Sequence, residues 1–416
     1  MTKTYFLITI GFFILGSCVN KKPAIQYSLN EIRMIKSKET DKANYKDYVS
    51  WGVQLGTKGE ENFHAVVCDN DNNPVVCGET GGKLGNRHFG DLDGLVVKYS
   101  PDGNTLWIRQ MGSHSKDTFK NICIDKEGDY LLVGYSEGDF ENNKNLGRSD
   151  AIIAKMSPKG KIIWVKQFGT DDLDEATAVV VDKKNNYYIA GNTRGKIGDI
   201  KKGVQDVFVL KMDSSGKILW KQQCGTKTRD NVNSMHIDQK NRIFIANSYY
   251  KSSVSSIIIM DTNGKIIKEK EDKKLKYWDI YVDKQKNIFA CGHTKNAGFI
   301  EKLNPSMEED WISTFRTPSG WSGEKKIVPL GNDLYATSGC MNWRQCYGFI
   351  RVYNNKGEKI ASIELNKPST CGNLLAVDKE GDFYHSGSTE TDLFAENKGN
   401  HDAYLVKVKK SLITQK

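Results

Sequence analysis

The stretch Trp164–Thr170 reads WVKQFGT, and nearly the same sequence occurs three more times in the chain. The other copies are WGVQLGT from Trp51, WIRQMGS from Trp107 and WKQQCGT from Trp220, at spacings of 56, 57 and 56 residues. A fixed period of this length indicates a repeat architecture built from one supersecondary unit per repeat. The first copy precedes every complete unit, so it needs an explanation of its own.

Each unit contains four short apolar runs separated by turns. From Glu175 the runs read EATAVVVD, NYYIAGNT, DVFVLKMD and KILWKQQCG, with tight turns around one longer loop. Short runs rich in Val, Ile, Tyr and Phe are typical of buried strands, and no extended window shows a helical apolar period. The pattern occurs twice upstream, weakens downstream, and ends in a seventh unit that lacks its fourth run.

Four strands per unit and seven units of about 43 to 57 residues predict an all-β fold, a seven-bladed β-propeller of four-stranded antiparallel blades. The run YVSWGVQLG from Tyr48 has the form of the missing strand. We therefore expect the N-terminal strand to complete blade 7 and to close the ring, which spans residues 48–410 and leaves no open sheet edge. Residues 411–416 form a C-terminal tail. The Trp of each WxxQxG copy then packs at a blade interface, and the Gly ends the strand.

The amino-acid sequence of the units resembles that of a known repeat family. DKEGDYLLVGYS with DAIIAKMSPKGKIIW, and DKKNNYYIAGNT with DVFVLKMDSSGKILW, resemble the SBBP-type β-propeller repeats of exported bacterial proteins. The resemblance covers about residues 48–409. It is strong in units 1 to 3 and 7 and loose in units 4 to 6, where Lys268 and Ala361 replace fourth-strand tryptophans. It implies a propeller fold and no particular activity.

The N-terminus predicts export. MTKTYFLITIGFFILGSC has a lysine near its start and an apolar run, Tyr5–Leu15, that is too short for an ordinary transmembrane helix. Its end resembles the bacterial lipobox, which implies a lipoprotein signal peptide over residues 1–17 and lipidation of Cys18 with acyl chains such as palmitate. Residues 18–47 then form the lipidated Cys and a flexible tether. The alternatives are an ordinary secretory signal and an uncleaved anchor.

The expected location is the cell envelope. Val19 follows the lipidated cysteine where enterobacterial inner-membrane lipoproteins carry Asp, which points by resemblance to the outer membrane. The periplasmic and surface sides both stay open. The net charge of +9 could suggest a nucleic-acid partner, but Lys and Arg are interleaved with Asp and Glu and no nucleic-acid-binding signature accompanies them. We therefore expect no nucleic-acid partner. The expected body is a monomeric ring attached to the membrane by its lipid.

Eight cysteines remain after Cys18, and export permits disulfides. Cys340 and Cys346 flank a short loop in SGCMNWRQCYG and are the pair that we expect to be bonded. No CxxC or Cys/His spacing indicates a metal site, and no cofactor is expected. The chain also lacks GxSxG, HExxH and Walker motifs.

The loops distinguish one part of the ring from another. Connections between second and third strands are long and Gly-rich in units 1, 2, 3 and 7 and short in units 4 to 6. Function concentrates where a repeat varies, so this looped face is the candidate binding face. Aligning the first strands on Trp278, five residues before the turn Asp, adds Thr177 to the same ring, and the last unit is aligned at Gly372. The candidate ligand-binding residues are His64, Lys120, Asn121, Asn233, Tyr249, Tyr250, Trp278, Asp279, Trp321, Trp343 and Asn373.

A polar mouth with an aromatic rim suits a sugar or peptide, although ordinary strand-entry groups and packing tryptophans would give the same pattern. We therefore expect a lipid-anchored, non-catalytic binding module for a glycan, peptide or protein. One alternative is a propeller hydrolase or lyase acting on polysaccharide or peptide, in which Asp279, His64 and Lys120 supply the acid and base. The other is a structural spacer in an envelope complex.

Overall fold

The computed structural model describes residues 32–34, 49–85, 87–249, 254–316, 322–341, 346–365 and 369–410. Every regular element in these ranges is a β-strand, which confirms the all-β expectation. None of the described segments is a helix long and apolar enough to cross a membrane. The predicted signal peptide, Cys18 and the C-terminal tail lie outside the described residues.

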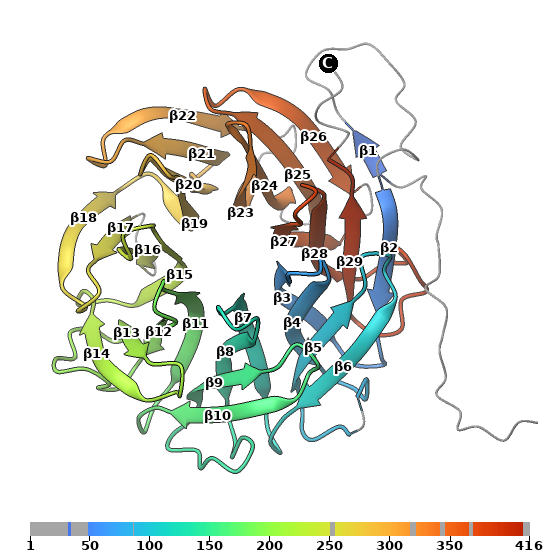
Figure 1. Cartoon of the computed structure of the whole chain (residues 1–416), viewed down its shortest axis with the longest axis vertical. Coiled ribbons are helices and arrows are strands. Elements are labelled where there is room, and N and C mark those ends of the chain that lie inside the picture. Colours follow the sequence, from blue (N-terminus) through green and yellow to red (C-terminus); the bar gives the residue numbers. More distant parts are fainter. Residues whose placement is uncertain are drawn as a thin grey trace, which may run out of the picture.

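The strands form a ring of antiparallel sheets around a central opening (Figure 1). Five of the sheets have four strands each, in the chain order β3 to β6, β7 to β10, β11 to β14, β15 to β18 and β19 to β22. Their bounds are β3 (Glu61–Cys68), β4 (Pro74–Thr80), β5 (Asp93–Tyr99), β6 (Thr105–Met111), β7 (Asp117–Ile124), β8 (Tyr130–Ser136), β9 (Asp150–Met156), β10 (Ile162–Phe168), β11 (Asp174–Val181), β12 (Tyr187–Thr193), β13 (Asp206–Met212), β14 (Ile218–Cys224), β15 (Asp230–Ile237), β16 (Ile243–Tyr249), β17 (Ser255–Met260), β18 (Ile266–Asp272), β19 (Lys276–Val282), β20 (Ile288–His293), β21 (Gly298–Leu303) and β22 (Glu309–Phe315).

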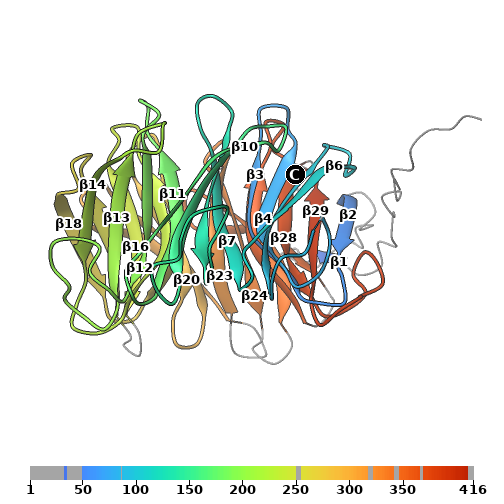
Figure 2. The ribbon, with the colours of Figure 1, turned by 90° about the horizontal axis from the view of Figure 1, so that it is seen from below.

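The remaining strands form one nine-stranded sheet made of two series. A single parallel pair, Tyr347 with Thr370, joins the series. The first comprises β23 (Ser322–Gly331), β24 (Leu334–Met341), β25 (Tyr347–Asn354) and β26 (Lys359–Leu365), and the second β27 (Thr370–Val377), β28 (Phe383–Thr389), β29 (Asp402–Val408) and β2 (Val49–Leu55). Three residues of the expected tether, β1 (Ile32–Met34), pair with the outer edge of β26. Seen from the side, the strands run between the two faces of the ring (Figure 2).

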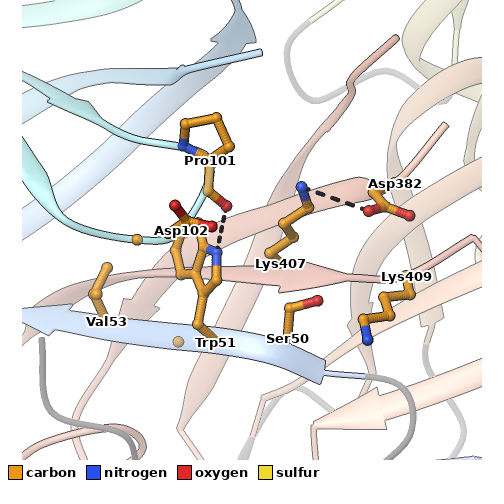
Figure 3. Close-up of a pocket in the computed structure, with 10 residues that line it drawn as sticks. Ser50, Trp51, Val53, Pro101, Asp102, Asp382, Lys407 and Lys409 are labelled. Carbon is orange, nitrogen blue, oxygen red and sulfur yellow. Dashed lines mark hydrogen bonds and ion pairs between the residues drawn. The ribbon is translucent and has the colours of Figure 1, made fainter. Parts of the chain in front are cut away.

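The ends of the chain close the ring. β2 pairs antiparallel with β29, from Val49 opposite Val408 onward, and the two strands lie side by side in Figure 1. This confirms that the first WxxQxG copy pairs with the last strand of the chain. The indole Nε1 of Trp51 then donates a 2.8 Å hydrogen bond to the Pro101 carbonyl, in the turn between β5 and β6. A hollow of about 430 Å³ lies at this seam (Figure 3), where Lys407 pairs with Asp382 at 3.5 Å.

Two of the other WxxQxG tryptophans repeat this hydrogen bond between neighbouring sheets, and the third, Trp164, packs against Tyr187 of the next sheet. Trp107 Nε1 donates to the Pro158 carbonyl at 3.2 Å, and Trp220 Nε1 donates to the Thr262 carbonyl at 3.0 Å. Each acceptor lies in the turn between the third and fourth strands of the next sheet. The Trp of the motif therefore packs at a sheet-to-sheet interface, as predicted.

The Gln of the motif has a role that the sequence analysis missed. Gln167 Oε1 accepts a 3.0 Å hydrogen bond from the backbone N–H of Phe140, and its Nε2 donates to the Gly138 carbonyl at 2.9 Å. Both partners belong to the long loop between β8 and β9. The same position anchors the other long loops through Gln54, Gln110 and Gln223. Because these amides satisfy the loop backbone, the motif and the long loop occur together.

The Gly of the motif is required by close packing. A Cβ on Gly169 would lie 2.2 Å from Asp150 Oδ1 and 2.8 Å from Asp174 Oδ2. These two buried carboxylates begin the third strand of one sheet and the first strand of the next. The glycine therefore lets two neighbouring sheets approach each other.

Candidate functional site

The innermost strand of every sheet carries a β-bulge at the same place. In β7, for example, Phe119 and Asn121 lie opposite the adjacent residues Gly134 and Val133, so Lys120 is an extra residue without a partner. A bulge bends a strand and redirects a side chain. The extra residues around the ring are His64, Lys120, Thr177, Asn233, Trp278, Lys325 and Asn373.

On six of the seven second strands a glycine lies opposite the bulge; β16 has Asn247 at this position. A Cβ on Gly134 would lie 1.8 Å from the Thr118 carbonyl oxygen, a distance that no side chain allows. This is the Gly of DYLLVGYS in the repeat unit. Corresponding clashes would occur at Gly78, Gly191, Gly292, Gly339 and Gly387. The repeated glycine in the sequence is therefore a signature of the bulge that builds the candidate site.

The bulged side chains line a central cavity of about 730 Å³. The structure brings together seven of the predicted site residues on its wall, namely His64, Lys120, Asn121, Asn233, Trp278, Asp279 and Asn373. Tyr249 is buried elsewhere and donates its hydroxyl to Ser256 and Glu269, each at 3.2 Å. Tyr250, Trp321 and Trp343 lie outside the described residues.

The predicted position of the inward-facing residue was wrong on the last inner strand, β27, and no such position was predicted on the inner strand before it, β23. The bulge of β27 lies at Asn373, whereas Gly372 pairs opposite Gly387. Lys325 of β23 was missed because that strand ends at Gly331 without the turn Asp from which the other positions were counted. The paired lysines in GEKKIV are the signal that could have revealed it, since they align with the KN of TFKNICI.

One part of the cavity wall holds a network of charged groups. His64 Nε2 lies 3.3 Å from Glu79 Oε2 and 3.5 Å from Lys120 Nζ. The Thr118 hydroxyl also donates to Glu79, at 2.6 Å. Burial alone would raise the pKa of Glu79, but the hydrogen bond and charge of His64, the charge of Lys120 and the Thr118 hydroxyl together lower this pKa to about 2. The carboxylate therefore stays ionised at any physiological pH.

Another part of the cavity wall combines aromatic and basic side chains from β19 and β23. The ammonium group of Lys325 lies against the ring of Trp278. The imidazole of His293 meets the same ring edge-on, with centroids 5.4 Å apart. Burial lowers the pKa of Lys325 to about 7, because a desolvated ammonium loses its proton more easily. Aromatic and cationic groups are thus combined in one corner of the cavity.

Asp279 connects neighbouring inner strands. It accepts hydrogen bonds from the Ser234 hydroxyl and from the backbone N–H of Ile327 at 2.9 Å, and Lys326 Nζ lies 3.1 Å away. Its side chain is almost fully buried. The three residues suggested as an acid–base set therefore divide: His64 and Lys120 meet, whereas Asp279 holds β15, β19 and β23 together.

Among the residues that the structure describes, two clusters have the composition of metal ligands. Cys340 and Cys346 form a disulfide, and Cys371 Sγ lies 3.7 Å from Cys340 Sγ. The second cluster contains Asp125, Glu127 and Asp129, but Lys155 Nζ sits among their carboxylates at 2.9, 2.6 and 3.2 Å. The lysine supplies the positive charge that this acidic cluster needs.

Comparison with known proteins identifies the fold. No family model matches the chain. Over 165 residues it is 22% identical to the regulatory protein FlaEY of Caulobacter vibrioides, an alignment that covers 36% of this chain and only 17% of that protein. The chain thus spans less than a fifth of that relative's length.

Two solved structures share the ring architecture. The WD40 domain of Neurospora crassa Pan2 has a TM-score of 0.53 at 11% identity, covering 86% of this chain and 95% of that one. A puromycin hydrolase S511A mutant complexed with PGG has a TM-score of 0.56 at 9% identity, covering 85% of this chain and 53% of the hydrolase. At such identities the likeness shows the fold alone, a β-propeller.

Proposed function

We propose that the protein is a lipid-anchored, non-catalytic binding module of the bacterial cell envelope, and that its ring has seven blades. Among the described residues, strand pairing joins the two four-strand series of the nine-stranded sheet at a single residue pair, which supports counting them as separate blades. The signal-like N-terminus and Cys18 support export and anchoring. The ligand is a glycan, a peptide or a protein segment.

The observation that carries the binding role is the central cavity. Its volume of about 730 Å³ lies within the range of small-ligand sites, roughly 300–1,000 Å³. Each inner strand directs its bulged residue into the cavity, which gathers an indole, two amides and several charged groups. Such a combination of an aromatic face with hydrogen-bonding groups suits a polar ligand.

The test is a glycan and peptide array probed with the full-length protein. Trp278→Ala should lower binding of the captured ligand at least about tenfold, because it removes the aromatic face of the cavity. Leu219→Ala, at an exposed apolar residue on the outer strand β14, is the matched control and should bind as the wild type does. Unchanged binding by Trp278→Ala, or no ligand at all, would contradict the proposal.

Anchoring has a separate test. Cells that express the wild-type protein and are fed labelled palmitate should yield a labelled protein in the membrane fraction. Cys18→Ala should lose the label and leave that fraction, since the acylated residue is gone. Retention of the label in this variant would exclude Cys18 as the anchor.

One geometric observation favours a hydrolase or lyase as a second candidate. His64, Glu79 and Lys120 form a network of titratable groups beside the cavity, an arrangement that acid–base chemistry can use. Turnover of a polysaccharide or peptide that His64→Gln abolishes, while Trp278-dependent binding persists, would establish this activity. Binding without any turnover would leave the non-catalytic role.

A further inference from the structure

The positive charges on the cavity wall differ in how they are compensated. Lys326 pairs with Asp279 at 3.1 Å, and Lys120 lies near His64 and Glu79. Lys325 is different: within the described ranges its ammonium has neither a hydrogen bond nor an ion pair and rests against the Trp278 ring. Among the described residues that line the cavity, Lys325 is therefore a basic side chain without a counter-ion.

A second unsatisfied group lies on the next inner strand. Asn373 Oδ1 is buried and, among the described residues, has no hydrogen-bond partner. The bulges of β23 and β27 place Lys325 and Asn373 at equivalent positions of neighbouring inner strands. A buried amide oxygen without a donor destabilises the folded protein, and a hydrogen-bond donor that reached it would remove that cost.

We propose that the ligand of this cavity is an acidic saccharide whose carboxylate pairs with Lys325 while a sugar face packs on Trp278. This inference rests on the proposed binding function and specifies its ligand class. The carboxylate supplies the counter-ion that Lys325 lacks, through a charge-assisted hydrogen bond. The Asn373 side chain lines the same cavity and offers its amide to a sugar hydroxyl. The cavity volume accommodates a short oligosaccharide.

The groups that face Lys325 favour an anion. On its own strand, Glu324 is paired with Arg351 and Lys326 with Asp279. The titratable groups on the neighbouring strands carry no negative charge near neutral pH; they are Lys276, Cys291, His293 and Cys371. Burial raises the pKa of the Cys291 and Cys371 thiols and lowers the pKa of Lys276 and of His293. Among these groups, an arriving carboxylate thus meets no negative charge that is not already paired with a basic side chain.

Binding should depend on pH with a definite sign. Burial lowers the pKa of Lys325 to about 7, so much of the free protein holds a neutral amine at pH 7 to 8. A bound carboxylate favours the ammonium form, so binding takes up a proton and weakens as pH rises from about 6 to about 9. Lys325→Arg should remove this dependence, because guanidinium stays charged throughout.

The experiment is calorimetric titration of the full-length protein with two matched pairs: trigalacturonate against its methyl ester, and sialyllactose against lactose. At least one acidic member should bind about tenfold more tightly than its neutral counterpart. Lys325→Met should weaken binding of the acidic probe about tenfold and leave that of the neutral probe unchanged. Lys325→Arg should restore acidic binding and flatten its pH profile. Strand circular dichroism confirms that each variant is folded.

The outcomes separate this inference from the proposed function. Equal affinity for acidic and neutral probes, or full acidic binding by folded Lys325→Met, overturns the acidic-saccharide inference, while Trp278-dependent capture of another ligand leaves the binding function standing. Inorganic phosphate that competes as well as trigalacturonate would reduce the site to a simple anion site and also overturns it. Absence of every Trp278-dependent ligand overturns both.

Discussion

The ring has two unlike halves. One half, formed by β2 to β14 with β27 to β29, keeps the WxxQxG motif and carries the long connections 81–92, 137–149, 194–205 and 390–401. In the other half, β15 to β26, the corresponding connections span only 250–254, 294–297 and 342–346. The motif loses its Gln throughout this half, and its Trp at Lys268 and Ala361.

The difference shows that the length of the loop and the presence of the motif Gln change together. A long loop has many backbone groups to satisfy, and the motif Gln satisfies several of them at once. Where the connection is short, a Gln at this position would have no loop backbone to hydrogen-bond, so other residues can replace it in the outer strand. The inner strands keep their bulges in both halves, and the short-loop half contributes Asn233, Trp278 and Lys325 to the cavity.

The largest expected effect tests how the short-loop half is held together. Arg351 and Glu324 form a buried ion pair there, and the Thr337 hydroxyl donates to Glu324 at 2.7 Å. Arg351→Met leaves a buried carboxylate without its partner and should lower the free energy of unfolding by about 3–5 kcal/mol in denaturant titration.

The matched control is Arg148→Met in the long-loop half, where the partner Asp172 is 4.0 Å away and both side chains are exposed. This change should cost less than about 1 kcal/mol. Equal losses in the two variants would mean that the buried pair is not what stabilises the short-loop half.

A second prediction concerns pH and the long-loop side of the cavity. The pKa of Glu79 is about 2 in the folded protein, below its ordinary value of 4.5. Folding therefore favours the ionised form, so the contribution is present above about pH 4.5 and is lost as pH falls toward 2. Between these values the wild type should lose about 3 kcal/mol more unfolding free energy than Glu79→Gln. Parallel pH profiles would show that the network with His64 does not stabilise the carboxylate.

The smallest effect sharpens the link between motif and loop. Gln167→Leu deprives the loop 137–149 of its anchor and should cost about 2 kcal/mol of unfolding free energy, with faster proteolysis within the loop. Thr314→Leu is the control, because it alters the same motif position on β22, where the side chain is exposed and the connection short. That variant should stay within about 0.5 kcal/mol of wild type. Similar protease sensitivity of the two variants would show that the motif Gln does not hold the loop in place.

The sequence by itself determined the strands, the ring and its closure. Alternating apolar runs and tight turns are local signals, and the missing last strand left only Val49–Leu55 to pair with β29. It also pointed to most of the cavity wall, because one register repeated along the chain places side chains at one level of the ring.

Only the tertiary structure decided the rest. Counting from turns cannot locate Lys325, because β23 is longer than the other inner strands. On β27 the count of five residues back from Asp378 gives Asn373, and the bulge lies there and not at Gly372. The partners of Gln167 and Glu79 are equally hidden, since they come from neighbouring strands and loops. Which charges are compensated depends on distances across the ring, and in the part of the chain that the structure describes these distances give Lys325 no counter-ion at the cavity wall.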